Sequence, residues 1–473
     1  MGRPMARTMF DKIWAEHAVA DLGGGLTLLD VDRHLIHDLV AGPAYDRLAA
    51  RGLPIRNPER TFAMPDHGVT SRPERPAGLD RVATGLIDRM REGSRAAGVR
   101  LFDIGEDGQG IVHVVGPELG LTLPGSLIVC GDSHSCTHGG LASLSFGIGT
   151  TEVVHVLATQ TIRQRKPKTM RIVYSGAPGA AVTAKDIILF TIARLGTKAG
   201  QGYAIEYAGP AIKALSIEER LTLCNLSIEL GAKIGMVAPD ERTYAYLKNK
   251  PFSPKGALFD QAVAYWRTIA SDADARFDAE HHIDIADVTP QISWGTSPED
   301  VIAIDGRVPD PAAEADPARR QRMTDALDYM GLAAGQALVG TPIDRVFIGS
   351  CANGRLSDLR EAARVAAGGR VAPHVIAWVV PGSRRVQQAA EAEGLDTIFR
   401  AAGFEWREPG CSLCLATAGE HLQPGERSVS TTNRNFVGRQ GPGVRTHLVS
   451  PATAAASALA GTICDVRRAG ESL

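Results

Sequence analysis

Residues 126–138 read SLIVCGDSHSCTH, a short apolar run that ends in a polar turn containing glycine. An apolar run of this length, bounded by turn residues, is typical of a buried strand. A helix is predicted to begin near residues 150–152, after Gly147 and Gly149. Strand, polar turn and helix in this order favour a parallel α/β sheet, in which ligands bind beyond the carboxyl ends of the strands.

The same alternation of strands and helices recurs along the chain. Thr183 to Asp186 resembles a capping box at the start of a helix, and Gly196 can end that helix. Further strands are predicted at 168–174, 345–348, 375–380 and 446–449, and helices at 187–195, at 356–367 and after Pro451. The fold class is therefore predicted to be α/β.

The chain length of 473 residues suggests about three domains, at roughly 150 residues for each. Two segments are candidate boundaries: the basic residues 163–168 and the stretch rich in proline and aspartate at 284–317. We therefore expect α/β domains at residues 1–167, 168–290 and 291–473.

Composition excludes several classes of protein. The formal charge is −2, with 51 lysines and arginines against 53 acidic residues, which argues against nucleic-acid binding through bulk charge. Apolar residues make up 44% and charged residues 22%, so a mostly disordered chain is excluded. The sequence contains no uncharged apolar run of about 18 residues, and residues 1–17 lack the apolar core of a secretion signal. We expect a cytoplasmic protein with reduced cysteines.

Cys411 and Cys414 form a C-x-x-C motif. Alone this motif fits a redox dithiol, half of a zinc site or part of a cluster site. No second C-x-x-C is present, but Cys351 lies 60 residues upstream, where a predicted strand ends. Three thiolates from two loops suit an iron–sulfur cluster in which one iron lacks a protein ligand. Three unrelated core thiols, or a structural zinc module, are the alternatives left open.

The turn after residues 126–130 presents Asp132, Ser133 and His134 in succession. A nucleophilic Ser-His-Asp set is disfavoured, because adjacent side chains seldom face one another and no G-x-S-x-G surrounds the serine. Acids and imidazoles elsewhere in the chain, each open to a structural reading, are Asp66, His67, His113 and Glu229.

The loop at residues 433–439 reads NRNFVGR and contains two arginines. The planar guanidinium matches a carboxylate, so this loop could hold a di-acid, although a solvated basic loop is the alternative. Residues 147–152 read GIGTTE and lack the third glycine of a dinucleotide fingerprint, so we reject a Rossmann cofactor site.

Taken together, these motifs resemble the aconitase superfamily, and most closely its branch that acts on isopropylmalate. The resemblance runs from about Thr8 to Ile463 and includes the stretches at 110–114, 155–160 and 430–440. It implies a three-domain α/β core around a central cluster cleft, without the swivelling fourth domain of aconitase itself.

The resemblance also implies roles for individual residues. It implies that Cys351, Cys411 and Cys414 hold a [4Fe-4S] cluster, with Asn225 and Asn353 beside it. Three acid–imidazole pairs would be catalytic, namely Asp66 with His67, His113 with Asp132, and His134 with Glu229. Substrate contacts would come from His37, Ser133, Asn433, Arg434 and Arg439.

The implied activity is a hydro-lyase reaction that isomerises 2-isopropylmalate and 3-isopropylmalate, in leucine biosynthesis, by dehydration and rehydration. In aconitase the base is a serine of the swivelling domain, and this chain ends after Ala460-Gly461, before any such domain. The resemblance therefore implies a small-subunit partner that carries the base, in a heterodimer or heterotetramer, and neither a nucleic-acid nor a membrane partner.

Two segments of this chain depart from the usual sequence of this branch. Residues 351–354 read Cys-Ala-Asn-Gly where the branch usually has Cys-Thr-Asn-Ser, and residues 106–110 read Glu-Asp-Gly-Gln-Gly where it has His-Pro-Tyr-Gln-Gly. A paralogue that acts on another 2-alkylmalate is therefore an open alternative. An RNA-binding or iron-sensing relative is disfavoured by the neutral charge.

Overall fold

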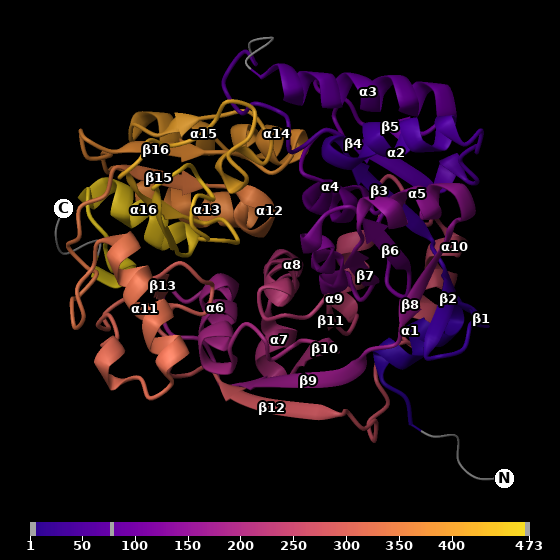
Figure 1. Cartoon of the computed structure of the whole chain (residues 1–473), viewed down its shortest axis with the longest axis horizontal. Coiled ribbons are helices and arrows are strands. Elements are labelled where there is room, and N and C mark those ends of the chain that lie inside the picture. Colours follow the sequence, from indigo (N-terminus) through magenta and orange to yellow (C-terminus); the bar gives the residue numbers. More distant parts are fainter. Residues whose placement is uncertain (1–5, 76–79, 469–473) are drawn as a thin grey trace. The chain divides into compact units, whose positions relative to one another are not determined.

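The structure is a computed structural model that describes residues 6–75 and 80–468. It divides into two compact units, each assembled from segments far apart in the sequence (Figure 1). Unit 1 comprises Met1–Gly68, Val82–Gly176 and Lys198–Asp284. Unit 2 comprises Val69–Arg81, Ala177–Thr197 and Ile285–Leu473.

Unit 1 contains two parallel sheets and a small antiparallel one. The strand orders are β5-β4-β3-β6-β7, β11-β10-β9-β12 and β1-β2-β8. The strands are β1 (Ala18–Asp21), β2 (Leu26–Asp30), β3 (Arg33–His37), β4 (Thr61–Met64), β5 (Arg100–Leu101), β6 (Leu127–Cys130), β7 (Leu144–Gly147), β8 (Thr161–Arg165), β9 (Lys168–Ser175), β10 (Tyr203–Ala208), β11 (Ile234–Val237) and β12 (Ala279–Asp284).

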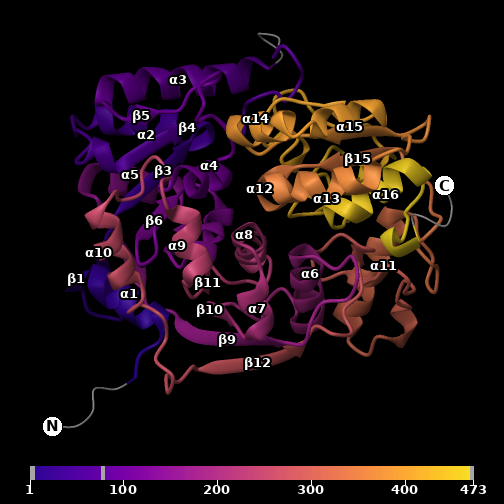
Figure 2. The same ribbon diagram turned by 180° about the vertical axis from the view of Figure 1, so that it is seen from behind.

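The helices of unit 1 cover these sheets. Figure 2 shows α8 and α9 from behind, and α8 packs on β11 and on the 3₁₀ segment η2. The helical segments are α1 (Met9–His17), α2 (Asp38–Ala50), η1 (Pro58–Arg60), α3 (Arg81–Ala97), α4 (Val112–Leu119), η2 (Ser133–Leu141), α5 (Thr150–Thr159), α7 (Pro210–Ala214), α8 (Ile217–Asn225), η3 (Leu226–Ile228), α9 (Glu241–Leu247) and α10 (Ala257–Trp266).

The strand β6 lies inside the first sheet and is buried along its whole length. Its parallel partners are β3, with Leu35 opposite Cys130, and β7, with Leu144 opposite Leu127. A strand covered on both faces needs apolar residues at consecutive positions, which explains the uninterrupted run Leu127–Cys130. Because β3, β4 and β6 are parallel neighbours, the polar turns that follow them share one edge of the sheet.

Unit 2 is built on one parallel sheet with the strand order β17-β16-β15-β18-β19 and a separate hairpin of β13 and β14. The strands are β13 (Gln291–Ser293), β14 (Val301–Ala303), β15 (Arg345–Ile348), β16 (Ile376–Val379), β17 (Glu405–Trp406), β18 (Arg427–Ser430) and β19 (Arg445–Leu448). The central strand β15 and its neighbour β18 both end directly before loops that carry candidate site residues.

Helices pack on this sheet and on one another, with α16 against β15 and α13. The helical segments are α6 (Ala184–Leu195), η4 (Pro311–Ala313), α11 (Pro317–Met330), α12 (Ser350–Asn353), α13 (Leu356–Ala366), α14 (Arg384–Ala392), α15 (Leu395–Ala401), η5 (Ser412–Cys414), α16 (Pro451–Ala460) and η6 (Val466–Arg468). Residues 177–197, which include α6, belong to this unit although the strands on either side of them in sequence belong to unit 1.

The α/β fold class is confirmed, and the strands and helices predicted from the sequence are present within one or two residues of their expected bounds. Each of the three expected domain ranges contains one parallel sheet, and the division into three domains around a central cleft stays a prediction. Within the described ranges, no helix has the length and apolar character needed to cross a membrane.

Candidate active site

One buried carboxylate shapes the edge of the first sheet in unit 1. Asp38, the first residue of α2, accepts hydrogen bonds from the backbone N–H groups of Asp66 (2.8 Å), His67 (3.0 Å) and Gly68 (2.6 Å). The turn after β4 is thereby fixed against the end of β3. Sequence reasoning did not identify Asp38, and the available signal was an acidic residue placed directly between an apolar strand and a helix.

His67 lies between two carboxylates. Its Nδ1 is 2.5 Å from Oδ1 of Asp66, and its Nε2 is 3.3 Å from Oδ2 of Asp132. Burial opposes a charged ring, but the neighbouring charges of Asp66 and Asp132 raise the pKa of His67 well above its usual value. His67 is therefore an imidazolium at neutral pH, with a proton on each ring nitrogen.

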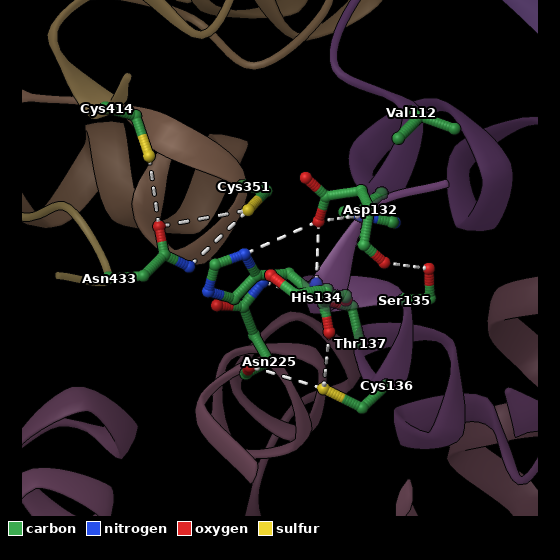
Figure 3. A network of polar contacts seen from close by, with 12 residues as sticks. Val112, Asp132, His134, Ser135, Cys136, Thr137, Asn225, Cys351, Cys414 and Asn433 are labelled. Atoms are coloured by element: carbon green, nitrogen blue, oxygen red, sulfur yellow. Dashed lines mark hydrogen bonds and ion pairs between the residues drawn. The ribbon is translucent and has the colours of Figure 1, made fainter. Parts of the chain in front are cut away.

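Asp132 is the point where three imidazoles meet. His113 Nε2 lies 2.9 Å from Oδ1. His134 contributes its backbone N–H at 2.6 Å and its Nδ1 at 3.5 Å, as Figure 3 shows. Burial favours the neutral acid, but the bonds from His113, His134 and His67 hold the pKa of Asp132 well below its usual range. The carboxylate is accordingly ionised at neutral pH.

The pair of His134 and Glu229 forms as the resemblance implied, with 3.1 Å between Nε2 and Oε1. Asn225, at the end of α8, donates to the hydroxyl of Thr137 at 2.7 Å, and its carbonyl contacts the Cys136 thiol at 3.4 Å (Figure 3). Asn225 is thus placed against η2 within unit 1, and its position beside a cluster stays a prediction.

A chain of two hydrogen bonds runs from His113 into the core. His113 Nδ1 is 3.1 Å from Nε2 of His138, whose Nδ1 is 2.7 Å from the hydroxyl of Thr122. Burial lowers the pKa of His113 below its usual value despite the bond to Asp132, so this ring is neutral beside the charged His67. His138 lies on the same turn as His134, but only the fold brings it to His113, so its role could not be predicted from the sequence.

His37 ends β3 and stacks against His67, with ring centroids 4.4 Å apart. Both of its ring nitrogens are buried, and neither has a hydrogen-bond partner among the described residues. The nearest acidic oxygen, Oδ1 of Asp66, is 4.0 Å away. A buried imidazole without a partner is costly unless a ligand completes its hydrogen bonds, so His37 is suited to contact a substrate.

Ser133 begins η2 and is half-buried, and its backbone is held by a close approach of β7. A Cβ atom on Gly147 would lie 2.5 Å from the carbonyl oxygen of Asp132 and 3.0 Å from Cα of Ser133. No side chain fits in that space, so glycine at position 147 allows the Asp132–Ser133 turn to pack directly on β7.

In unit 2 one amide contacts thiols from two loops. Oδ1 of Asn433 lies 3.3 Å from Sγ of Cys414 and 3.9 Å from Sγ of Cys351, as Figure 3 shows. Cys411 is joined to Cys414 through its carbonyl, which accepts the Cys414 N–H at 2.9 Å. All seven cysteines are free, and these three are between 5% and 7% exposed. The fold therefore brings together residues 351, 411, 414 and 433 as predicted.

The backbone beside the cysteines is unusual. Ser350 and Ser412 have positive φ angles of 77° and 47°, and Cys411 directly before Ser412 has right-handed helical angles. A right-handed residue followed by a left-handed one turns successive N–H groups towards one side, a conformation that binds anions and iron–sulfur groups. Strain of this kind in non-glycine residues is retained mainly at functional sites.

Two buried groups anchor the C-x-x-C turn. Leu413 packs in a core cluster with Phe347 and Val380. The Glu420 carboxylate accepts hydrogen bonds from the Ser412 hydroxyl at 2.6 Å and from the Ser71 N–H at 2.6 Å, and Arg407 pairs with it at 3.2 Å. Glu420 was not identified from the sequence, because its partners lie 8 to about 350 residues away in the chain.

The arginine-bearing loop is held at its base and open at its tip. Asn435 is buried and donates to the carbonyl of Gly295 at 2.6 Å, whereas Phe436 is exposed. Arg434 and Arg439 are half-buried, and Nε of Arg439 is buried without a hydrogen-bond partner among the described residues. An unpaired buried guanidinium nitrogen suits a carboxylate ligand.

Asn353 lies two residues after Cys351, and its Nδ2 donates to Asp358 at 2.9 Å. Three buried free thiols from two loops, an amide that contacts both loops and an anion-binding backbone together fit a [4Fe-4S] cluster with one iron free of protein ligands.

Comparisons with known proteins agree with this geometry. A model of the aconitase family, described as aconitate hydratase, matches residues 11–461. The chain is 59% identical over 461 residues to 3-isopropylmalate dehydratase large subunit 1 of Bradyrhizobium diazoefficiens, across 98% of this chain and 96% of that relative. Among solved structures, holo-form aconitase X of Thermococcus kodakaraensis is similar with a TM-score of 0.48 and 10% identity, over 90% of this chain and 89% of that one. At that score the structural likeness adds nothing to the family match.

Proposed function

This chain belongs to the aconitase family, and we propose that it is the large, cluster-bearing subunit of a hydro-lyase that interconverts 2-isopropylmalate and 3-isopropylmalate. The observation that carries the proposal is the meeting of Cys351 and Cys414 at Asn433, with Cys411 in the same turn. The name of the relative from Bradyrhizobium supports the substrate, and the resemblance implies the pathway, leucine biosynthesis.

Cys351, Cys411 and Cys414 would hold the [4Fe-4S] cluster. When bound, the cluster supplies a Lewis acid, because three cysteines leave one iron able to coordinate a hydroxyl or a carboxylate. The chain's own contribution at this place is to keep three free thiols buried, with Cys351 and Cys414 both in contact with Asn433.

His67 is the group best suited to protonate the departing hydroxide. It is charged at neutral pH, and its contact to Asp132 through Nε2 is the longer of its two contacts, at 3.3 Å against 2.5 Å. The Nε2 proton is therefore the one more readily transferred. Asp66 and Asp132 then hold the neutral ring in place, and their negative charges favour its protonation again.

The di-acid substrate needs cationic and neutral donors. Arg434 and Arg439 match its carboxylates as planar forks, and Ser133 and the unpaired ring of His37 offer further hydrogen bonds. His113 with Asp132 and His134 with Glu229 keep neighbouring imidazoles in fixed orientations. Family membership and the local geometry of each of these side chains together support its place in the reaction.

A second subunit would complete the enzyme. The Bradyrhizobium relative, of which this chain covers 96%, is named as a large subunit. The base that removes the proton α to a carboxylate is not among the residues assigned here. We infer that a small subunit supplies it, in a heterodimer or heterotetramer.

Anaerobic reconstitution tests the cluster assignment. The wild-type chain should become brown and bind about four irons and four sulfides. Cys414→Ser should remain folded by circular dichroism but lose the cluster and the isomerase activity. Cys464→Ser is the matched control, because the Cys464 thiol contacts the carbonyl of its neighbour Asp465 and lies outside the candidate site. A colourless wild-type protein that binds one zinc would refute the assignment.

A panel of 2-alkylmalates tests the substrate. The reconstituted chain, together with its small subunit, should turn over 2-isopropylmalate with the highest kcat/KM. One observation supports the alternative of another 2-alkylmalate. Glu106, which stands where the branch has histidine, is exposed and pairs with Arg100 at 3.2 Å. A clear preference for a different alkyl group would establish the paralogue.

A further inference from the structure

Lys185 is a buried cation with no role in the proposed reaction. It is the second residue of α6 and is 0% exposed. It is also the only lysine in the three segments of unit 2, where every other strongly basic residue is arginine. Burying an ammonium group is costly unless its charge and its hydrogen bonds are compensated, so the surroundings of Lys185 indicate its function.

The Lys185 ammonium donates hydrogen bonds to two loops. Nζ donates to the carbonyl of Thr432 at 2.7 Å, to the carbonyl of Thr431 at 2.9 Å and to Oδ1 of Asn353 at 3.3 Å. Thr431 and Thr432 follow β18 and lead into Asn433, and Asn353 follows Cys351 by two residues. One side chain thus holds the loops of the neighbouring strands β15 and β18 at the place where the thiols meet.

All three hydrogen-bond acceptors are neutral, so they satisfy the ammonium protons but not its charge. Burial lowers the pKa of Lys185 to about 8, and the negative charges of Cys414, Asp358 and Cys351 oppose that shift, with Cys414 the strongest. Asp358 is already engaged by Asn353 at 2.9 Å and by the Arg355 N–H at 2.9 Å. The negative groups near Lys185 are therefore the carboxylates of Asp358 and Asp186 and, when ionised, the thiols of Cys414 and Cys351.

Asp186, the next residue, is a negative neighbour of Lys185, but its hydrogen bonds go to other groups. Its carboxylate accepts hydrogen bonds from Thr183 and from the Gln291 N–H, and burial raises its pKa to about 6. It caps α6, and this cap places Lys185 on the first turn of the helix.

We propose that Lys185 is a positioning residue for the cysteine site, which aligns the Cys351 and Asn433 loops and offsets the negative charge of the thiolate-bound cluster. This inference rests on the proposed function, because a cluster must be present for the charge to act on it. Nearby charge and hydrogen bonding set the reduction potential of iron–sulfur clusters. Loss of a nearby positive charge makes reduction less favourable and lowers that potential.

The test compares reconstituted wild type with Lys185→Gln, Lys185→Arg and the control Lys198→Gln. Glutamine keeps length and hydrogen-bonding capacity but lacks the charge, whereas Lys198 is exposed in unit 1. The readouts are circular dichroism of the apo-protein, iron content, iron loss to a chelator and the midpoint potential from an EPR-monitored titration. None of them depends on turnover.

Lys185→Gln should fold and bind the cluster, with a lower midpoint potential and about tenfold faster iron loss than wild type. Lys185→Arg should retain more of the wild-type potential, and Lys198→Gln should match wild type. A wild-type potential and iron loss in Lys185→Gln would overturn the inference. A wild-type chain that takes up no cluster would instead overturn the proposed function.

Failure to fold is also decisive. If Lys185→Gln is unfolded and the larger Lys185→Arg is folded, the pocket requires the charge, which supports the inference. If both variants are unfolded, the pocket requires the shape of lysine, and a role in balancing the cluster is refuted.

Discussion

Asp132 shows how much of the site a single residue controls. Its carboxylate contacts His113, His134 and His67, three residues from different segments of the chain. The resemblance implied only the pair with His113. Neither the other contacts nor Asp38, His138, Glu420 and Lys185 could be predicted, because each depends on partners brought together by the fold. Cys351, Cys411 and Cys414 were accessible from the sequence because thiols have few chemical roles.

Replacement of Asp132 by asparagine should remove one of the two negative charges, beside that of Asp66, that raise the pKa of His67. We expect kcat of the reconstituted two-subunit enzyme to fall by about 10²–10⁴-fold, the usual contribution of a positioned acid or base. Asp30→Asn is the matched control, because Asp30 is a surface residue of unit 1 that pairs with Arg60. Urea unfolding of both variants establishes that the fold persists. An unchanged kcat in Asp132→Asn would remove Asp132 from the mechanism.

At the scale of elements, the strands that carry the site follow directly from the sequence. Apolar runs with turn residues at their ends predicted β6 and β15 closely, because burial on both faces requires uninterrupted apolar residues. The strand β18, which reads Arg-Ser-Val-Ser, has no apolar run and was not predicted. The close packing between the elements was not predictable, because a glycine needed for a close approach looks the same in sequence as a glycine in a turn. Gly147 and Gly149 illustrate this difference.

Gly147→Ala should disable the enzyme while Gly149→Ala should not. A Cβ at position 147 would lie 2.5 Å from the Asp132 carbonyl, whereas at position 149 the only atom within 4 Å is a Glu152 oxygen at 3.9 Å. We expect kcat/KM of Gly147→Ala to fall by about 10²-fold, the cost of displacing a catalytic turn by about 1 Å. Steady-state kinetics on the two variants decide the matter, and equal activities would contradict the packing argument.

The loop between β13 and β14 contains an acid that makes unfolding depend on pH. Burial, with Glu299 nearby, raises the pKa of Asp300 to about 6. A raised pKa in the folded state gives stability that is fully present below the unfolded pKa of about 3.9 and is lost as the pH rises through about 6.

Asp300→Asn should therefore remove part of the pH dependence of unfolding. Between pH 4 and pH 7 the free energy of unfolding of the apo wild type should fall by about 2 kcal/mol more than that of the variant. Urea titrations at both pH values measure the difference. Asp310→Asn, at an exposed position, should behave as wild type, and a loss of the same size in Asp300→Asn as in wild type would contradict the prediction.

At the scale of the whole molecule, the sequence predicted the sheets better than the division into units. The chain forms β9 in unit 1, contributes α6 to unit 2 and returns to unit 1 for β10. Local periodicity identifies α6 as a helix but does not tell which core it joins. Its contacts with β13 and β14, strands about 100 residues later, decide that. The consequence is functional, because α6 delivers Lys185 to the cysteine loops of unit 2.

All proposed cluster ligands lie in unit 2, so cluster binding should stabilise that unit by mass action. Reconstitution should raise its free energy of unfolding by about 2.7 kcal/mol, the value for a ligand at about a hundred times its Kd. In hydrogen exchange, protection should increase most in residues 349–355, 411–416 and 431–435, while α11 of the same unit reports only the stabilisation of the whole unit. A chelator should reverse the gain, and Cys414→Ser should show none. Equal protection of α11 and the three loops would mean that reconstitution stabilises the unit without binding at these cysteines.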